Sequence, residues 1–151
     1  MDQIRRIKSL KVESQIFNQI TSMDRTEFPQ PWSERDWGDL DLKERYQLFV
    51  LEEKGELVGS ALFEINTWDK QAHLLKLTIS SVFRGKSLGR TLLAASLYSM
   101  LATIETCYLE VSVSNPYAVS LYKKMGFAVL NTKKKFYSNG EDAYAMQAIL
   151  N

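Results

Sequence analysis

The sequence of 151 residues has little of what would cross-link it or bind a metal. Its single cysteine, Cys107, cannot form an intrachain disulfide, which favours a reducing compartment. Its single histidine, His73, has no Cys or His partner for a metal site. The three prolines and seven glycines form no linker-like tract, so residues 1–151 are expected to fold as a single domain.

Neither charge sign dominates, and no long apolar run is present. The 19 Lys and Arg against 18 Asp and Glu give a net charge of +1, far from the basic excess of nucleic-acid-binding domains. The longest uncharged stretch, residues 91–104, is shorter than the roughly 20 residues of a membrane span. The amino terminus lacks the apolar core of a signal peptide. These absences predict a cytoplasmic protein without direct nucleic-acid or membrane partners.

Apolar spacing predicts helices and strands in mixed order, which is typical of an α/β fold with a mixed sheet. Val12, Ile16 and Ile20 have helical spacing, a short helix is expected after the capping residue Ser33, and a long helix is expected to end at Thr103. The segments with strand-like patterns are, in chain order, residues 4–8, 46–51, 57–65, 73–79, 108–113, 127–137 and 143–150.

The predicted strand over residues 73–79 has an apolar pattern on both faces. Strict alternation places Leu75, Leu77 and Ile79 on one face and Leu74 on the other.

Residues 80–90 join that strand to the long helix and contain two glycines and three basic residues. The unpaired N–H groups and the dipole at a helix start favour anions, so a phosphate group is expected to bind here. The triplet Gly85-Lys86-Ser87 ends like a P-loop, but Ser80 stands where a P-loop needs its first glycine. This mismatch disfavours a nucleoside-triphosphate site, and a plain surface turn is the other interpretation.

Residues 115–127 fit the pattern N-x-x-A-x-x-L-Y-x-x-x-G-F without a mismatch. Asn115 is a preferred cap, Pro116 a preferred first-turn residue and Gly126 a preferred stop, so a helix of about ten residues is expected. This helix directly follows the strand that contains Leu109-Glu110-Val111.

On these motifs the chain resembles the GNAT superfamily of acyl-coenzyme A-dependent N-acetyltransferases. Arg84, Ser87 and Gly89 occupy the marked positions of its pyrophosphate loop, with serine in place of a usual glycine at 87. If that position needs a positive φ, the serine is strained. The resemblance covers nearly the whole chain and implies a GNAT fold. This fold is a mixed, mostly antiparallel sheet of six to seven strands, flanked by about four helices and splayed between the fourth and fifth strands.

The resemblance also implies acetyl-CoA as cosubstrate, no metal, and a role for two side chains. Glu110 matches the family's general base, and Tyr122 matches its general acid toward the coenzyme A sulfur. From the residues alone, an ion pair for Glu110 and core packing for Tyr122 are the plainer interpretations. The residues that match the cofactor site are Leu77, Thr78, Ile79, Arg84, Gly85, Lys86, Ser87, Leu88, Gly89, Arg90 and Asn115.

Two shorter elements, Pro31-Trp32-Ser33 and Glu141-Asp142-Ala143, resemble the subfamily that acetylates the N-terminal alanine of a small-subunit ribosomal protein. The expected substrate and partner is therefore a ribosomal protein N-terminus, and the protein is expected to be a monomer or weak dimer. The residues expected to line the substrate groove are Trp32, Trp37, Tyr137, Glu141 and Asp142.

Two other functions stay open at this point. One is acetyl transfer to a small amine or a lysine side chain, and the other is a non-catalytic acyl-coenzyme A binding module. The run Lys133-Lys134-Lys135 is expected to be a solvated face, with contact to the cofactor's 3′-phosphate or to RNA left open. Cys107 is expected to be a buried thiol.

Overall fold

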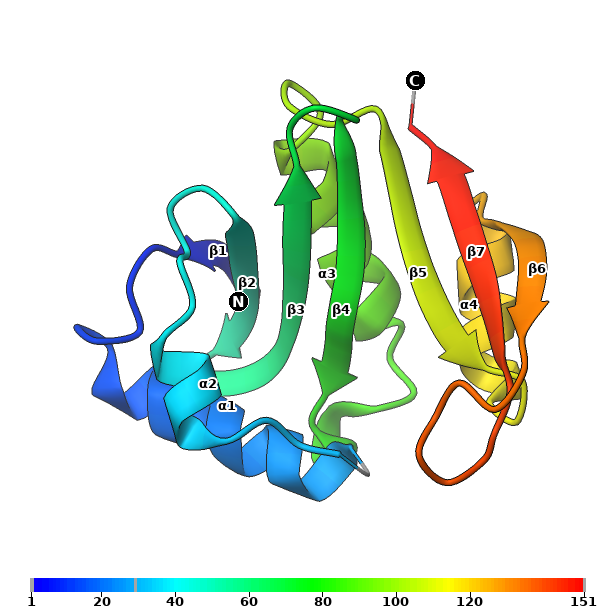
Figure 1. Cartoon of the computed structure of the whole chain (residues 1–151). Helices are drawn as coiled ribbons and strands as arrows, with labels where there is room; N and C mark the ends of the chain where they lie inside the picture. Colours follow the sequence, from blue (N-terminus) through cyan, green and yellow to red (C-terminus); the bar gives the residue numbers. More distant parts are fainter. Residues whose placement is uncertain (1, 29, 151) are drawn as a thin grey trace.

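Seven strands form one sheet in the computed structural model, which describes residues 2–28 and 30–150 (Figure 1). The strand order is β1-β2-β3-β4-β5-β7-β6, and all pairs are antiparallel except β4 with β5. In chain order the elements are β1 (Asp2–Ile7), α1 (Ser14–Glu27), α2 (Glu34–Gly38), β2 (Tyr46–Glu53), β3 (Glu56–Asn66), β4 (Gln71–Ile79), the 3₁₀ turn η1 (Ser81–Phe83), α3 (Leu88–Ser99), β5 (Thr106–Ser112), α4 (Pro116–Lys124), β6 (Ala128–Lys133) and β7 (Ala143–Ile149).

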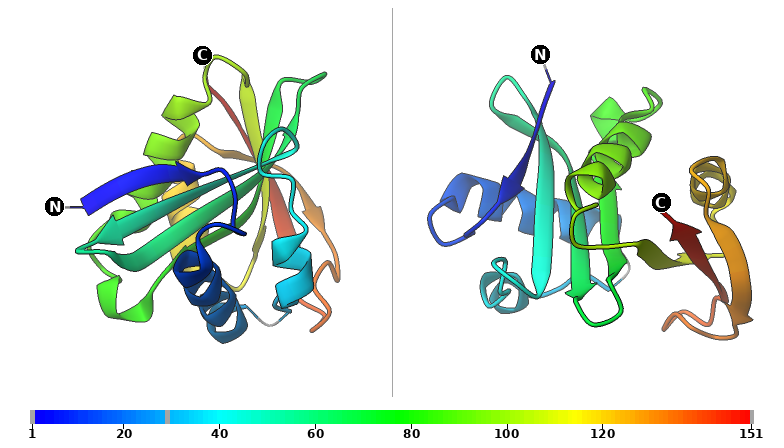
Figure 2. Two further views of the ribbon diagram at one scale, coloured as in Figure 1. Left: turned by 90° about the vertical axis from the view of Figure 1, so that its left-hand side faces the viewer. Right: turned by 90° about the horizontal axis from the view of Figure 1, so that it is seen from above.

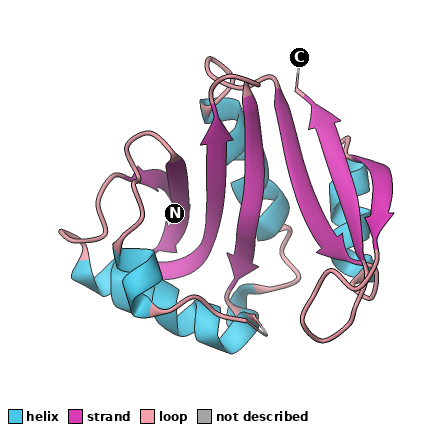
Figure 3. Ribbon diagram, viewed as in Figure 1, coloured by secondary structure: helices cyan, strands magenta, loops and turns pink. Residues whose placement is uncertain are grey.

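Helices cover both faces of the sheet (Figures 2 and 3). On one face α1 and α2 bury Ile16, Ile20 and Trp37 against β2 and β3. On the other face α3 and α4 bury a second cluster that includes Leu92 and Tyr122. The mixed sheet, its helices and the predicted element order are therefore confirmed. None of the helices in the described part of the chain is long and apolar enough to cross a membrane.

A β-bulge in β4 overturns one expectation from the sequence. Lys76 pairs with Leu62 of β3 and Leu74 with Phe63, so Leu75 is an extra residue in the ladder. Leu74 consequently packs with Leu77 and Ile79 in the core under α3, while Leu75 packs in the core under α1. Strict alternation placed these two leucines on the wrong faces because the extra residue shifts the pleat by one position.

The pairing between β4 and β5 is short and opens the sheet. The two strands are hydrogen-bonded only where Gln71, Ala72, His73 and Leu74 meet residues 106–109. Beyond that point they diverge, and the gap between them is visible as a V in Figure 1. The expected splay between the fourth and fifth strands is confirmed.

Several predicted element ends differ from the observed ones. Val12 lies before α1 and is 81% exposed, so it does not belong to the helical apolar stripe. The long helix α3 ends at Ser99, where the chain enters turns instead of continuing to Thr103. β6 ends at Lys133 because the N–H of Lys135, which has a φ of 51°, donates to Asp142.

Other local predictions are confirmed. Ser33 caps α2 by accepting a 3.0 Å hydrogen bond from the N–H of Asp36, and α4 is preceded by its cap Asn115 and ends before Gly126. Cys107 is fully buried, and this burial raises the pKa of its thiol to about 12.

Candidate active site

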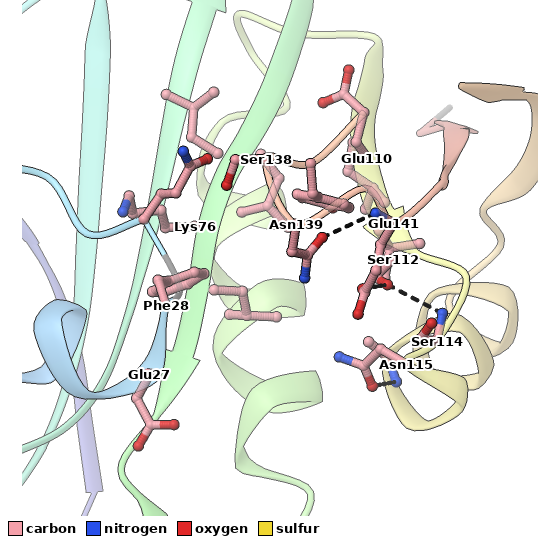
Figure 4. A pocket seen from close by; sticks show the side chains of 18 of the residues that line it. Glu27, Phe28, Lys76, Glu110, Ser112, Ser114, Asn115, Ser138, Asn139 and Glu141 are labelled. Atoms are coloured by element: carbon pink, nitrogen blue, oxygen red, sulfur yellow. Dashed lines mark hydrogen bonds between the residues drawn. The ribbon is translucent and has the colours of Figure 1, made fainter. Parts of the chain in front are cut away.

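The divergence of β4 and β5 creates a cavity of about 640 Å³ (Figure 4). Four parts of the chain line it: the end of α1 with the segment that follows, the diverging halves of β4 and β5, α4 with the residues just before it, and the loop between β6 and β7. The lining residues are Glu27, Phe28, Gln30, Trp32, residues 74–77, residues 109–112, Ser114, Asn115, Ala118, Tyr122, Tyr137, Ser138, Asn139 and Glu141. The cavity thus contains both residues for which the sequence predicted a catalytic role, Glu110 and Tyr122.

Glu110 lies on β5 one residue beyond the last pair with β4, and both of its carboxylate oxygens are engaged. Oε1 lies 2.7 Å from Nε2 of His73, and Oε2 accepts a 2.9 Å hydrogen bond from Nζ of Lys133. Burial alone would raise the pKa of Glu110, but the hydrogen bonds from His73 and Lys133 outweigh it and lower the pKa to about 2. The carboxylate is therefore ionised throughout the neutral range.

Neither contact of Glu110, with His73 or with Lys133, was expected from the sequence. His73 lies beside Tyr108 in the parallel register, with ring centroids 5.0 Å apart, and Tyr108 is two residues before Glu110 on the same strand face. A pairing of residues 73–79 with 108–113 would have suggested this contact. For Lys133 the expectation of a solvated face is wrong, because its ammonium is bound to Glu110. Lys134 and Lys135 are exposed.

Tyr122 lies on α4 with only 8% of its surface exposed. Its ring packs against Phe127 with centroids 5.7 Å apart. Burial raises the pKa of the Tyr122 phenol above its ordinary value of 10.0, so the group keeps its proton at neutral pH. Asn115 starts this helix by accepting a 3.2 Å hydrogen bond from the N–H of Ala118, and it also lines the cavity.

The segment between β4 and α3 forms the basic, glycine-containing loop that the sequence predicted. Gly85 has a φ of +83°, and Ser87, directly before α3, has a φ of 58°. The serine is therefore in the left-handed region, where a non-glycine residue is strained. Arg84 donates from Nε to the carbonyl of Ile79 at 3.1 Å, and its guanidinium also pairs with Glu27 at the end of α1.

The residues expected at the cofactor are distributed over two places. Leu77 and Asn115 line the cavity. Thr78, Ile79 and residues 84–90 are outside its lining and continue from the end of β4 to the first turn of α3. Beyond Leu74, the edge of β4 that faces β5 has no strand partner among the described residues. This free edge and the helix start leave backbone N–H and C=O groups for a ligand.

The residues expected at the substrate groove are also divided. Trp32, Tyr137 and Glu141 line the cavity. Trp37 does not, because it is only 2% exposed and its Nε1 donates to Asp24 at 3.0 Å. Asp142 does not line it either, since its carboxylate accepts the N–H of Lys135 and so shapes the loop between β6 and β7.

A buried ion pair fixes the wall of the cavity that the segment between α1 and α2 provides. Asp24 of α1 lies 2.6 Å from Nζ of Lys76 on β4, and both side chains are nearly inaccessible. The same carboxylate accepts the N–H of Trp32 at 2.8 Å and Nε1 of Trp37. The ammonium also lies over the ring of Phe28, 4.5 Å from its centroid. These contacts hold Phe28 and Trp32 in place at the cavity.

Comparison with known proteins shows the family from the sequence and the same fold from a solved structure. Residues 17–127 match the family described as acetyltransferase (GNAT). The N-alpha-acetyltransferase of Sulfurisphaera tokodaii is 38% identical over 114 residues, which are 68% of each chain. A putative [ribosomal protein bS18]-alanine N-acetyltransferase of Bacillus subtilis is 29% identical over 155 residues, covering 96% of this chain and 95% of that protein. The crystal structure of the ribosomal-protein-S18-alanine N-acetyltransferase from Escherichia coli superposes with a TM-score of 0.86 at 24% identity, over 100% of this chain and 95% of that one.

Proposed function

Because the chain belongs to the acetyltransferase (GNAT) family, we propose that it transfers the acetyl group of acetyl-CoA to the α-amino group of a protein N-terminus. The observation that carries this proposal is the cavity at the splay, which is lined by both an ionised Glu110 and a protonated Tyr122. Acetyl transfer to an amine needs one proton acceptor and one proton donor. The relatives at 38% identity are named N-alpha-acetyltransferases, which supports an α-amino group as acceptor.

We further propose that the acceptor is the N-terminal alanine of a small-subunit ribosomal protein. The relative from Bacillus subtilis with a corresponding name aligns with nearly the whole chain. Phe28 and Trp32 form an aromatic wall of the cavity, which offers apolar surface to the methyl group of an alanine. Glu141 adds a carboxylate at the loop between β6 and β7, which suits a basic peptide.

The cavity and the adjoining loop fit acetyl-CoA as the second substrate. The unpaired edge of β4 beyond Leu74 offers backbone groups to the amides of an extended pantetheine arm. The loop before α3, with Gly85 and Ser87 at positive φ, and the first turn of that helix present backbone N–H groups to a pyrophosphate. When bound, acetyl-CoA supplies a thioester whose carbonyl carbon an amine can attack.

Glu110 and Tyr122 would move the protons of this reaction. An α-ammonium has a pKa of about 7.7–8.0, so the amine must lose a proton before its nitrogen forms the new bond to the acetyl carbon. Glu110 attracts the ammonium and accepts that proton. Because the pKa of Glu110 is low, the carboxyl group then releases the proton again. His73, whose Nε2–H donates to Oε1, orients the carboxylate, and the proton leaves Glu110 to water in the cavity.

The leaving group needs a proton as well. As the carbon–sulfur bond breaks, the thiolate of coenzyme A takes the phenolic proton of Tyr122, which the raised pKa keeps in place until then. Tyr122 regains a proton from solvent after the products leave.

The test compares acceptors by release of free coenzyme A. We expect turnover with a short peptide that begins with alanine and none with the same peptide blocked at its amino terminus. Glu110→Gln and Tyr122→Phe should each lower kcat by about 10²-fold or more. Turnover on spermidine or on a lysine side chain but not on the free peptide would favour a small-amine enzyme. Cofactor binding with no turnover on any amine would indicate a binding module.

A further inference from the structure

The two oxygens of Glu110 are held by different parts of the sheet. Oε1 contacts His73 on the neighbouring strand β4, while Oε2 accepts a hydrogen bond from Lys133 at the end of β6. β6 is separated from β5 by β7, so the two backbones lie about 10 Å apart. The Lys133 side chain therefore crosses the full width of β7 to reach the carboxylate.

Small residues on β7 make this crossing possible. Ala145 is directly opposite Glu110, and Ala143 is directly opposite Lys133, so all four side chains are on the same face of the sheet. An alanine at each position leaves the space above β7 to the lysine side chain. The contact between Lys133 and Glu110 is thus a consequence of the sheet register.

The lysine ammonium lies among three groups that suit a cation. Besides Glu110, the ring of Tyr108 has its centroid 5.4 Å from Nζ, and the ring of Phe136 has its centroid 5.3 Å away. A carboxylate combined with aromatic faces is a recognised means of binding an ammonium group. These three side chains constitute a binding site that Lys133 fills.

We propose that Glu110, Tyr108 and Phe136 form the subsite for the acceptor's ammonium group, and that Lys133 occupies this subsite only until the acceptor binds. The inference rests on the proposed function, which requires the acceptor amine to meet Glu110. Lys133 carries the same primary ammonium as the acceptor, so the exchange leaves the buried carboxylate paired and the local charge unchanged.

The surroundings of Lys133 allow the exchange. Its side chain is 40% exposed, so the ammonium can move into solvent at the modest cost of a partly exposed ion pair. The loop that follows Lys133 supplies Tyr137 and Glu141 to the cavity. The peptide therefore approaches Glu110 along the same segment that holds the lysine.

The test removes the internal ammonium and measures acceptor binding. Lys133→Met keeps the length of the side chain, and we expect the Kd of an alanine peptide in the presence of coenzyme A to fall about fivefold, because no internal cation competes. The KM for the peptide should fall equally, and the KM for acetyl-CoA should not change. Lys134→Met, at the exposed neighbouring position, should match the wild type, and Lys133→Arg should retain most of the competition.

The opposite result would overturn the proposal. A weaker peptide Kd, or a loss of kcat in Lys133→Met comparable to that in Glu110→Gln, would show that Lys133 supports Glu110 instead of standing in for the acceptor. Phe136→Leu is a second variant that keeps the ion pair of Lys133 with Glu110, in case Lys133→Met does not fold. It should raise the KM for the peptide about threefold. An unchanged KM in Phe136→Leu would also contradict the subsite. The proposed function is tested by a different observation: it is wrong if the wild type neither binds nor acetylates a peptide with a free N-terminus.

Discussion

At the scale of single residues, different surroundings give Glu110 and Tyr122, the two side chains proposed to move protons, different charge states. Glu110 is surrounded by hydrogen-bond donors, which keep its carboxylate ionised despite burial. Tyr122 is buried against Phe127, and this burial keeps its phenol protonated. A proton acceptor and a proton donor therefore exist together at neutral pH in the same cavity.

The low pKa of Glu110 predicts an acid-dependent loss of stability. The pKa falls from 4.5 in the unfolded chain to about 2 in the fold, so the stabilisation is fully present above pH 4.5 and is lost as pH falls toward 2. Denaturant unfolding between pH 5 and pH 2 should show a loss of about 2 kcal/mol that is missing in Glu110→Gln. Identical pH dependence of the two proteins would contradict the ion cluster.

Replacing Ser87 with glycine should increase the stability of the protein. Its φ of 58° costs a non-glycine residue about 1 kcal/mol, so Ser87→Gly should raise the free energy of unfolding by about 0.5–1 kcal/mol in urea. The loop already has this conformation, so the Kd for acetyl-CoA should change less than about twofold.

Gly85 provides the control for Ser87. It has a φ of +83° and no neighbouring heavy atom that a Cβ would meet. Gly85→Ala should therefore destabilise the protein by about 1 kcal/mol through backbone strain alone. A destabilised Ser87→Gly would show that the serine side chain has a contact that outweighs its strain.

At the scale of elements, two irregularities of β4 shape the cavity: a β-bulge and an early end to its pairing with β5. The bulge at Leu75 shifts its pleat, so Lys76 faces α1 while Leu77 faces the core under α3. The end of its pairing at Leu74 then leaves its second half free at the cavity. One strand thus holds Phe28 at the cavity through Lys76 and leaves its own edge there unpaired.

The close approach of β3 to the end of β4 requires a glycine. A Cβ on Gly59 would lie 2.7 Å from the carbonyl oxygen of Thr78 and 2.5 Å from Cδ1 of Ile79, and the backbone oxygen cannot yield. Gly59→Ala should cost about 2 kcal/mol of unfolding free energy or more. Gly89→Ala in α3 is the matched control: its Cβ would make ordinary contacts, and alanine should stabilise the helix by up to about 1 kcal/mol. Equal effects of the two substitutions would contradict this packing.

Substitutions of Asp24 and Lys76 should have non-additive effects on the free energy of unfolding. Removing either charge leaves the other buried without its counterion, so Asp24→Asn and Lys76→Met should each cost about 3 kcal/mol in urea unfolding. The double variant buries no charge at this site and should cost at least about 1 kcal/mol less than the sum of the two. A strictly additive result would mean that the two side chains contribute independently.

At the scale of the whole molecule, the features that could be predicted from the sequence are those that depend on residues close together in the chain. The caps at Ser33 and Asn115 were predictable because each satisfies a backbone N–H three positions away. The bulge at Leu75 was not, because it is defined only by pairing with β3. The contacts of Glu110 were not either, since His73 and Lys133 are 37 and 23 residues distant and meet it only through the sheet register.

The identity of the acceptor amine is tested most directly by mass spectrometry. A peptide that begins with alanine and contains one internal lysine offers both kinds of amine to the protein and acetyl-CoA. Fragmentation of the product then locates the acetyl group. We predict acetylation at the α-amino group alone, and loss of this acetylation in Glu110→Gln. Acetylation of the lysine side chain, or equal acetylation of both amines, would contradict it.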